Sequence, residues 1–325
     1  MAVTFLNSES CFVPNNKIEV IGNEMNKMKS NPLATGSVLC DGEYIVKSVI
    51  GYGGFGITYS AVSTYDKSIV AIKELFMSRY CFRDYLGCVH TFNTASARNS
   101  FAQARRLFLD EPLSIMNCTH NNIIKAFDRF FDNDTVYYVM ELLPGNNLEK
   151  VLKMSNGISV NKAVAYVLDI ADAVDYMHRY GIVHLDIKPS NIMVRNTGEA
   201  VLIDFGSSRH YAENDCKYNS PAILSRGYFS QEMYDDSYSN PANYTRMDIY
   251  ALGVTLYRLI TNKHLTGYDD QFASVPDAVK KVIEKATDIS EKGYHSVSEF
   301  ISDLRTVNRS CRISMPENKS YRTCA

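Results

Sequence analysis

The stretch His184-Leu185-Asp186-Ile187-Lys188-Pro189-Ser190-Asn191 is followed downstream by Ile203-Asp204-Phe205-Gly206. Together they place three hard oxygen donors, those of Asp186, Asn191 and Asp204, within twenty residues. Such donors suit Mg²⁺, which proteins usually hold with few carboxylates together with substrate phosphates. An H-x-D triplet is common by chance, but its combination with K-P-x-N and a downstream D-F-G is not. The two segments therefore predict a centre for phosphate chemistry.

A glycine-rich stretch, Gly51-Tyr52-Gly53-Gly54-Phe55-Gly56, provides a second signal. Glycines permit a tight turn whose N–H groups approach phosphate oxygens closely. In dinucleotide-binding folds a G-x-G-x-x-G motif leads into a helix. Here it leads into Ile57-Thr58-Tyr59-Ser60-Ala61-Val62, which is typical of a strand. The order strand, glycine loop, strand predicts a flap over phosphates, although the motif alone also fits an ordinary hairpin turn.

The third signal is Val70-Ala71-Ile72-Lys73. Strand alternation places Ala71 and Lys73 on one face, the face toward which the glycine flap also points. A small residue beside a lysine suits a flat base next to its phosphates. Taken alone, the segment is better explained as a strand with a solvated lysine.

The pattern of the remaining residues predicts an α+β fold. β-branched and aromatic runs between turn residues predict the strands of a small antiparallel sheet. These runs are 44–50, 57–62, 69–73, 123–131 and 136–142, with one helix over 100–116. After Pro144-Gly145 the apolar spacing becomes helical. It predicts one helix between Ser159 and Gly181 and others over 246–261, 276–287 and 297–307.

These elements predict two lobes with a cleft near 143–147. We expect a flexible leader over 1–36, a sheet lobe with one main helix over 37–143, a larger helical lobe over 144–308 and a tail over 309–325.

Composition and charge exclude several classes of protein. The chain has 325 residues, of which 46% are hydrophobic and 22% charged, enough to bury a core. Its net charge of −2 lacks the basic excess of a nucleic-acid binder, so no nucleic-acid partner is predicted. The eight cysteines lack zinc or redox spacing, and the N-terminus lacks the pattern of a signal peptide. The longest apolar run, 249–260, is too short for a membrane span. These features predict a cytoplasmic protein without a membrane span.

In identity, order and spacing the motifs resemble the protein kinase family, over about residues 42–305. The segments G-G-F-G-I-T-Y, V-A-I-K-E and H-L-D-I-K-P-S-N are similar to those of bacterial (Hanks-type) serine/threonine protein kinases. The resemblance implies the bilobal protein-kinase-like fold and Mg²⁺-ATP-dependent phosphoryl transfer to serine and threonine hydroxyls of proteins, autophosphorylation included. It implies ATP and Mg²⁺ as cofactors, with Mn²⁺ as an alternative cation. It identifies no particular substrate protein and leaves the oligomeric state open.

The resemblance also implies catalytic roles. Asp186 matches the aspartate that accepts the proton of the substrate hydroxyl, and Lys188 matches the lysine typical of serine/threonine kinases. Lys73 matches the strand lysine that holds the α- and β-phosphates. Glu111, counted back from the His120 turn, matches the helix glutamate that pairs with that lysine.

Metal and nucleotide contacts are carried over in the same way. Asn191 and Asp204 match the metal ligands. In the nucleotide site the glycine loop covers the phosphates, hinge backbone groups bond the adenine and apolar side chains sandwich the base. The implied nucleotide-binding residues are Ile50, Gly51, Gly53, Gly54, Gly56, Thr58, Ala71, Lys73, Met140, Glu141, Leu143 and Met193.

Further matches concern structural support. His184, Phe205 and Ile115 match a hydrophobic stack, so His184 is interpreted as a packed residue rather than a base. Asp248 matches the aspartate that anchors the catalytic loop from a buried helix.

Several positions depart from the family pattern. Leu185 stands where an arginine usually pairs with a phosphorylated activation loop, which disfavours activation of that kind, although Ser220 and Ser225 are available as targets. Glu232 ends the segment as expected, but Gly293 occupies the place of its arginine partner.

Two departures concern the sheet lobe. Pro112 directly follows Glu111 and predicts a kinked or unusual helix at that point. The connection over 75–99 is also longer than the family minimum.

Two other functions stay open. A pseudokinase scaffold would lack one of the key residues Lys73, Asp186, Asn191 or Asp204, and all four are present. A small-molecule kinase of the aminoglycoside type shares the H-x-D-x-x-x-x-N loop. Lys188, the D-F-G and the helix motif around Asp248 favour protein substrates.

Overall fold

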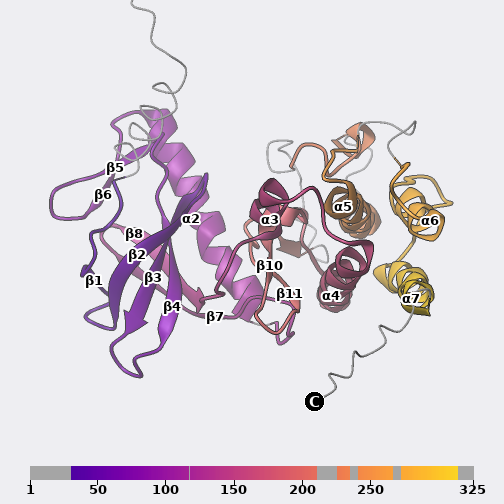
Figure 1. The fold of residues 1–325 in the computed structure, drawn as a ribbon. Coiled ribbons are helices and arrows are strands. Elements are labelled where there is room, and N and C mark those ends of the chain that lie inside the picture. Colours follow the sequence, from indigo (N-terminus) through magenta and orange to yellow (C-terminus); the bar gives the residue numbers. More distant parts are fainter. Residues whose placement is uncertain (1–30, 117, 211–224, 235–240, 266–271, 314–325) are drawn as a thin grey trace, which may run out of the picture. The chain divides into compact units, whose positions relative to one another are not determined.

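The computed structural model describes residues 31–116, 118–210, 225–234, 241–265 and 272–313. The chain divides into two units, drawn in Figure 1. Unit 1 comprises residues 1–106 and 129–139, and unit 2 comprises residues 107–128 and 140–325. The boundary passes through one helix, whose last turns pack with unit 2. The domain bounds expected from the sequence stay a prediction.

Unit 1 is built on a six-stranded sheet with the order β1-β2-β3-β4-β8-β7. Its strands are β1 (Val38–Leu39), β2 (Tyr44–Tyr52), β3 (Gly56–Ser63), β4 (Ile69–Leu75), β7 (Ala126–Asp132) and β8 (Thr135–Glu141). The first four run antiparallel to their neighbours, as the sequence predicts. The predicted strand over 123–131 begins later than expected, because Ile123 instead bridges to Leu202 in unit 2.

Helix α2 (Ala95–Met116) starts one turn earlier than predicted. The hydroxyl of Thr94 accepts a hydrogen bond from the N–H of Ala97 at 3.1 Å, which caps an otherwise unsatisfied donor of the first turn. The helix continues through Pro112 to its end, so the proline does not divide it.

Unit 2 consists mainly of helices packed around α5 (Pro241–Thr261), which contacts α4 (Val160–Arg179), α6 (Asp277–Ala286) and α7 (Val297–Ile313) (Figure 1). The smaller elements are α3 (Leu148–Met154), β9 (Ile182–Val183), η1 (Pro189–Asn191), β10 (Ile192–Val194), β11 (Ala200–Leu202), β12 (Arg209–His210) and η2 (Gln231–Tyr234). Two short antiparallel pairings, β9 with β12 and β10 with β11, lie among these helices. The α+β class predicted from the sequence is confirmed.

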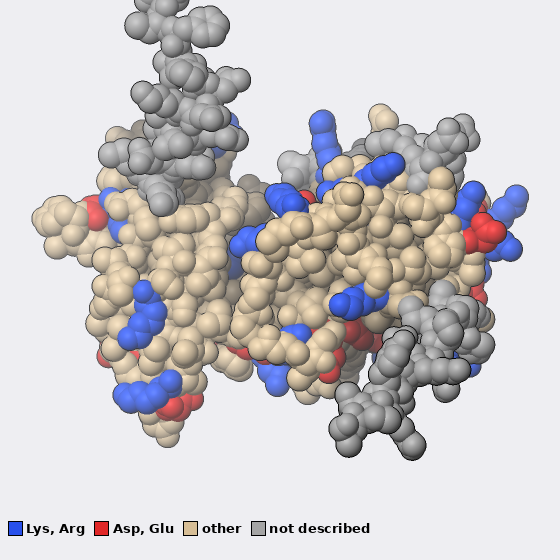
Figure 2. All heavy atoms as spheres, viewed as in Figure 1, with Lys and Arg blue, Asp and Glu red and all other residues tan. Residues whose placement is uncertain are grey.

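Charged side chains of both signs lie on the face shown in Figure 2. Among the helices in the described part of the chain, none combines the length and apolar character that crossing a membrane requires.

The long connection after β4 forms a hairpin that the sequence analysis did not predict. Its strands, β5 (Cys81–Arg83) and β6 (Val89–Thr91), pair antiparallel. Arg83 extends from the hairpin to Glu74 of β4, where Nη2 lies 2.6 Å from Oε2. The side chains are 3% and 0% exposed, so this ion pair is shielded from water.

Two tyrosines complete the surroundings of Glu74. The hydroxyl of Tyr59 donates to Oε2 at 2.7 Å, and the hydroxyl of Tyr137 donates to Oε1. Burial and, after it, the negative charge of Glu74 raise the pKa of both tyrosines far above the usual value. Both hydroxyls therefore stay protonated and donate. The network joins strands β3, β4 and β8 to the hairpin through buried, satisfied polar groups.

We predict that Arg83→Met lowers the free energy of unfolding by about 3–5 kcal/mol, because it leaves the Glu74 carboxylate buried without a cation. The double variant Arg83→Met/Glu74→Gln removes the charge while keeping an oxygen for a tyrosine, and is expected to recover part of the loss. Urea denaturation of the three proteins measures this. A loss of less than about 1 kcal/mol in the free energy of unfolding of Arg83→Met would contradict the prediction, because it would be no larger than that of an exposed ion pair.

Candidate active site

The carboxylate of Asp186 lies at the centre of a hydrogen-bonded group in unit 2. Nζ of Lys188 donates to both its oxygens, at 2.9 Å to Oδ1 and 2.8 Å to Oδ2. Nδ2 of Asn191 donates to Oδ2 at 2.8 Å and to the Asp186 carbonyl oxygen at 2.9 Å. One short segment, which runs from the end of β9 through η1, therefore brings together the predicted site residues Asp186, Lys188 and Asn191.

A fourth member, Ser225, was not predicted in this role. Its hydroxyl donates to Oδ1 of Asp186 at 2.6 Å and lies 2.6 Å from Nζ of Lys188. Thirty-nine residues separate Ser225 from Asp186, so no local motif connects them. The sequence analysis treated Ser225 as an available phosphorylation target. That interpretation stays a prediction, and in this structure the hydroxyl is hydrogen-bonded to the carboxylate and the lysine. Ser220 lies outside the described residues.

The main chain of this segment is fastened by Asp248 of α5, as predicted. Its Oδ2 accepts the N–H of His184 and its Oδ1 accepts the N–H of Leu185, both at 2.8 Å. Nε2 of His178 also lies 2.9 Å from Oδ2. Leu185 has a φ of +64°, a left-handed conformation that a branched residue adopts only where its surroundings hold it there.

His184 is packed rather than exposed to reactants. Its ring meets that of Phe205 edge-on, with 4.9 Å between the centroids. Full burial lowers the pKa of His184, so its imidazole is neutral. Ile115, the other predicted member of the stack, is also buried.

Asn191 and Asp204 supply the oxygen donors expected of a magnesium site. Because Nδ2 of Asn191 faces Asp186, the amide presents Oδ1 as its remaining acceptor. Oδ1 of Asp204 accepts a long hydrogen bond, 3.3 Å, from the N–H of Gly206. Carboxylate and amide oxygens are the ligands that Mg²⁺ prefers, so these residues fit the ion.

Glu111 is 4% exposed and lies beside the D-F-G segment. A Cβ built on Gly206 would lie 3.6 Å from Oε2 of Glu111 and 3.4 Å from Oδ1 of Asp204. Gly206 therefore lies within van der Waals reach of both carboxylates. Lys73 belongs to unit 1 and Glu111 to unit 2, so their pairing stays a prediction.

The other predicted nucleotide residues of unit 1 form a row across three strands. Thr58 of β3 is the register partner of Gly51 on β2 and of Lys73 on β4. Nζ of Lys73 lies 5.5 Å from the centroid of the Tyr138 ring. Ala71 is buried on the same strand, whereas Ile50 is 42% exposed.

The glycine loop turns between β2 and β3, as predicted. The N–H of Gly53 donates to the carbonyl oxygen of Gly56 at 2.8 Å and closes the turn. A Cβ on Gly56 would lie 2.0 Å from the carbonyl oxygen of Glu74, so only glycine lets β3 approach β4 this closely. Gly54 has open space around it.

The predicted hinge residues Met140, Glu141 and Leu143 lie close along the chain, and the predicted base-contacting residue Met193 comes from the distant strand β10. Met140 and Leu143 are buried, and Glu141 ends β8. Met193 lies on β10 and forms an isolated bridge with Asn147, whose side chain caps α3 by accepting the N–H of Lys150.

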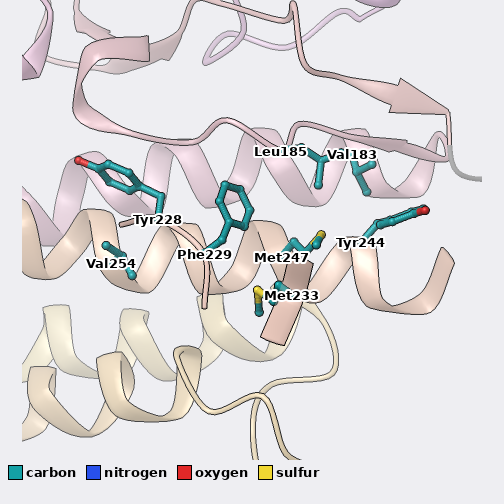
Figure 3. Close-up of a cluster of buried hydrophobic side chains, with 8 residues drawn as sticks. All are labelled: Val183, Leu185, Tyr228, Phe229, Met233, Tyr244, Met247 and Val254. Atoms are coloured by element: carbon teal, nitrogen blue, oxygen red, sulfur yellow. The ribbon is translucent and has the colours of Figure 1, made fainter. Parts of the chain in front are cut away.

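Leu185, which stands where the family usually has a charged arginine, packs in a cluster of buried apolar side chains (Figure 3). Figure 3 shows Leu185 with Val183 on the segment above α5, Phe229 and Met233 lower down, and Tyr228 further along the helix near Val254. The cluster consists of Val183, Leu185, Tyr228, Phe229, Met233, Tyr244, Met247 and Val254. Apolar packing therefore fastens this segment at the position where the family usually has an arginine.

The second departure from the family pattern is also explained by packing. A Cβ on Gly293 would lie 2.0 Å from the carbonyl oxygen of Asp288, so no arginine fits there. Glu232 is exposed on η2. Its carboxylate is therefore not the buried partner of an arginine from this position.

Comparison with known proteins defines the class to which the fold and site belong. Residues 44–322 match the model of the protein kinase domain. A "Probable serine/threonine-protein kinase" of Clostridium acetobutylicum is 32% identical over 228 residues, which cover 70% of this chain and 31% of that protein. "Aurora/IPL1-related protein kinase 2" of Caenorhabditis elegans is 31% identical over 242 residues, 71% of either chain. A solved structure titled "PpkA-294 apo form" superposes with a TM-score of 0.72 at 21% identity, covering 85% of this chain and all of that one.

The chain therefore belongs to the protein kinase family, as its motifs indicated. A "Probable serine/threonine-protein kinase PknB" of Lactococcus lactis is 27% identical over 292 residues, 83% of this chain. That match agrees with the resemblance to bacterial kinases. The chain spans about a third of the Clostridium relative's length and 43% of the Lactococcus relative's.

We predict that Leu185→Arg lowers the free energy of unfolding by about 3–5 kcal/mol, because it places an unpaired charge in a fully buried apolar cluster. The matched variant Leu185→Met keeps the volume apolar and is expected to cost less than about 1.5 kcal/mol. Thermal and urea denaturation of both variants measure the difference. A Leu185→Arg protein as stable as the Leu185→Met protein would contradict this prediction.

Proposed function

We propose that this protein transfers the γ-phosphoryl group of Mg²⁺-ATP to serine and threonine hydroxyls of protein substrates. The observation that carries the proposal is the surroundings of Asp186, whose carboxylate receives hydrogen bonds from Lys188, Asn191 and Ser225. These bonds fix the direction in which the carboxylate meets an incoming hydroxyl. Phosphoryl transfer asks little covalent chemistry of a protein, so positioning of this kind supplies much of the catalysis.

The geometry also suggests how a substrate enters. A carboxylate offers about four lone-pair sites, and here two bonds from Lys188 and one each from Asn191 and Ser225 use them. The substrate hydroxyl displaces one of the bonds from Lys188. As its oxygen bonds to the γ-phosphorus, the bond from that phosphorus to the ADP oxygen breaks and the hydroxyl proton passes to Asp186.

Residues on both units take part in nucleotide binding under this proposal. The glycine loop and Lys73 hold the phosphates, and backbone groups of Glu141 and Leu143 bond the adenine. Asn191 and Asp204 hold the cation, either Mg²⁺ or Mn²⁺, which neutralises phosphate charge when bound. Autophosphorylation follows where a serine or threonine of the same chain reaches Asp186.

Protein substrates are favoured over small molecules by Lys188, the D-F-G and the helix motif around Asp248, and Nζ of Lys188 bonds both Asp186 and Ser225. The names of the Clostridium and Lactococcus relatives agree with serine and threonine as acceptors. A scaffold without activity is disfavoured, because Lys73, Asp186, Asn191 and Asp204 are all retained. A cytoplasmic location remains a prediction from the composition.

The test is transfer of labelled phosphate from ATP with Mg²⁺ to a generic protein acceptor and to the protein itself. We predict label on serine or threonine, reduced at least about 100-fold in Asp186→Asn, because an amide cannot accept the hydroxyl proton. Asp172→Asn, which changes an exposed aspartate of α4 in the same unit, is the control and should match the wild type.

Two outcomes would contradict the proposal. ATP binding without transfer to any acceptor would support a scaffold. Transfer to an aminoglycoside but not to protein would support a small-molecule kinase.

A further inference from the structure

A two-pronged ion pair joins the hinge to the hairpin β10–β11 within unit 2. Nη1 of Arg195 lies 2.8 Å from Oε2 of Glu141, and its Nη2 lies 2.7 Å from Oε1. The two parallel bonds match a planar guanidinium to a planar carboxylate and fix their relative orientation. The bond to Glu141 raises the pKa of Arg195, so its charge is constant over any working pH.

Glu141 is held by more than this pair. Its Oε1 also accepts the N–H of Lys125 at 3.0 Å, and its own N–H donates to the carbonyl oxygen of Lys125 at 2.9 Å. Backbone and side chain of Glu141 are thus both fixed. The next peptide groups along the chain are those assigned above to the adenine.

The other end of the pair is equally rigid. Arg195 follows β10, and its N–H donates to the carbonyl oxygen of Glu199 at 2.9 Å to close the hairpin turn. The same hairpin carries Met193, which pairs with Val201 of β11. Arg195 is therefore two residues from the side chain assigned to the face of the adenine.

The pair is also partly shielded, with 27% of the arginine side chain and 16% of the glutamate side chain exposed. Partly buried ion pairs are screened by salt much less than exposed ones. A bidentate contact also restricts both rotation and sliding of the joined segments.

We propose that Arg195 is a positioning residue for ATP. Acting through Glu141, it holds the adenine-bonding peptide groups of the hinge in register with Met193. The inference rests on the proposed function, since it concerns the nucleotide site of the same enzyme. No motif in the sequence marks Arg195, and its partner lies 54 residues away.

The test compares Arg195→Gln with the wild type in steady-state transfer at varied ATP. We expect KM for ATP to rise about tenfold while kcat changes less than about twofold, because the hinge is loosened but Asp186 is untouched. Arg195→Lys keeps the charge but not the fork, so its KM should lie between the two. Direct measurement of ATP affinity by calorimetry checks that KM follows binding.

Two further variants separate positioning from general destabilisation. Glu141→Gln should raise KM by a similar factor, and its combination with Arg195→Gln should add little, since either change breaks the same pair. Arg305→Gln breaks an exposed pair with Asp172 on α4 and should leave KM at the wild-type value. Melting temperatures of all variants show whether they are folded.

The outcomes are distinguishable from failure of the proposed function. If the wild type neither binds ATP nor transfers phosphate, the proposed function itself is wrong. If the wild type is active and the KM for ATP of Arg195→Gln is unchanged, the positioning role is wrong. It is also wrong if Arg195→Gln and Arg305→Gln change KM and kcat to the same extent.

Discussion

The site depends first on one buried carboxylate, that of Asp248. It accepts hydrogen bonds from the N–H groups of His184 and Leu185, and its Oδ2 also lies 2.9 Å from Nε2 of His178. These contacts come from the middle of α5, the helix around which unit 2 is packed. They hold Leu185 in a left-handed conformation and thereby set the direction of the next residue, Asp186. Without that constraint, the carboxylate of Asp186 would be free to point away from Lys188, Asn191 and Ser225.

At positions 185 and 293 the protein lacks the arginines that are usual in the protein kinase family, and at position 185 apolar packing takes the place of a charged contact. Leu185 joins aromatic and sulphur-containing side chains of the segment after Ser225, and Gly293 leaves no room for an arginine. The segment that bears Ser225 is therefore fastened by burial of apolar surface, which does not require a phosphate and is little affected by salt.

The strands and helices that depend on patterns among neighbouring residues could be predicted from the sequence. The strand order around the glycine loop follows from alternation and turn chemistry, and the helices of unit 2 follow from apolar spacing. The expected roles of Asp186, Asn191 and Asp204 come from two short motifs that lie close together in the chain. In each instance the information lies within a few residues, which is the range that pattern analysis can use.

Contacts between distant segments could not be predicted in this way. Ser225 reaches Asp186 across 39 residues, and Arg195 reaches Glu141 across 54. The sequence analysis placed Arg83 in the connection over 75–99 and expected no partner for it. Its partner Glu74 lies on the preceding strand, and the two tyrosines that bond Glu74 come from other strands. A polar residue gives no sign in the sequence of whether it will be exposed or buried with a partner. Only the fold supplies that partner.

The most direct test of the account is the rate of phosphoryl transfer at saturating ATP in Asp248→Asn. An amide at this position turns one acceptor into a donor that faces a backbone N–H, so the loop before Asp186 loses a fixed direction. The account predicts a rate at least about 100-fold below the wild type in a protein that still binds ATP. A folded variant whose transfer rate stays within about threefold of the wild type would contradict it.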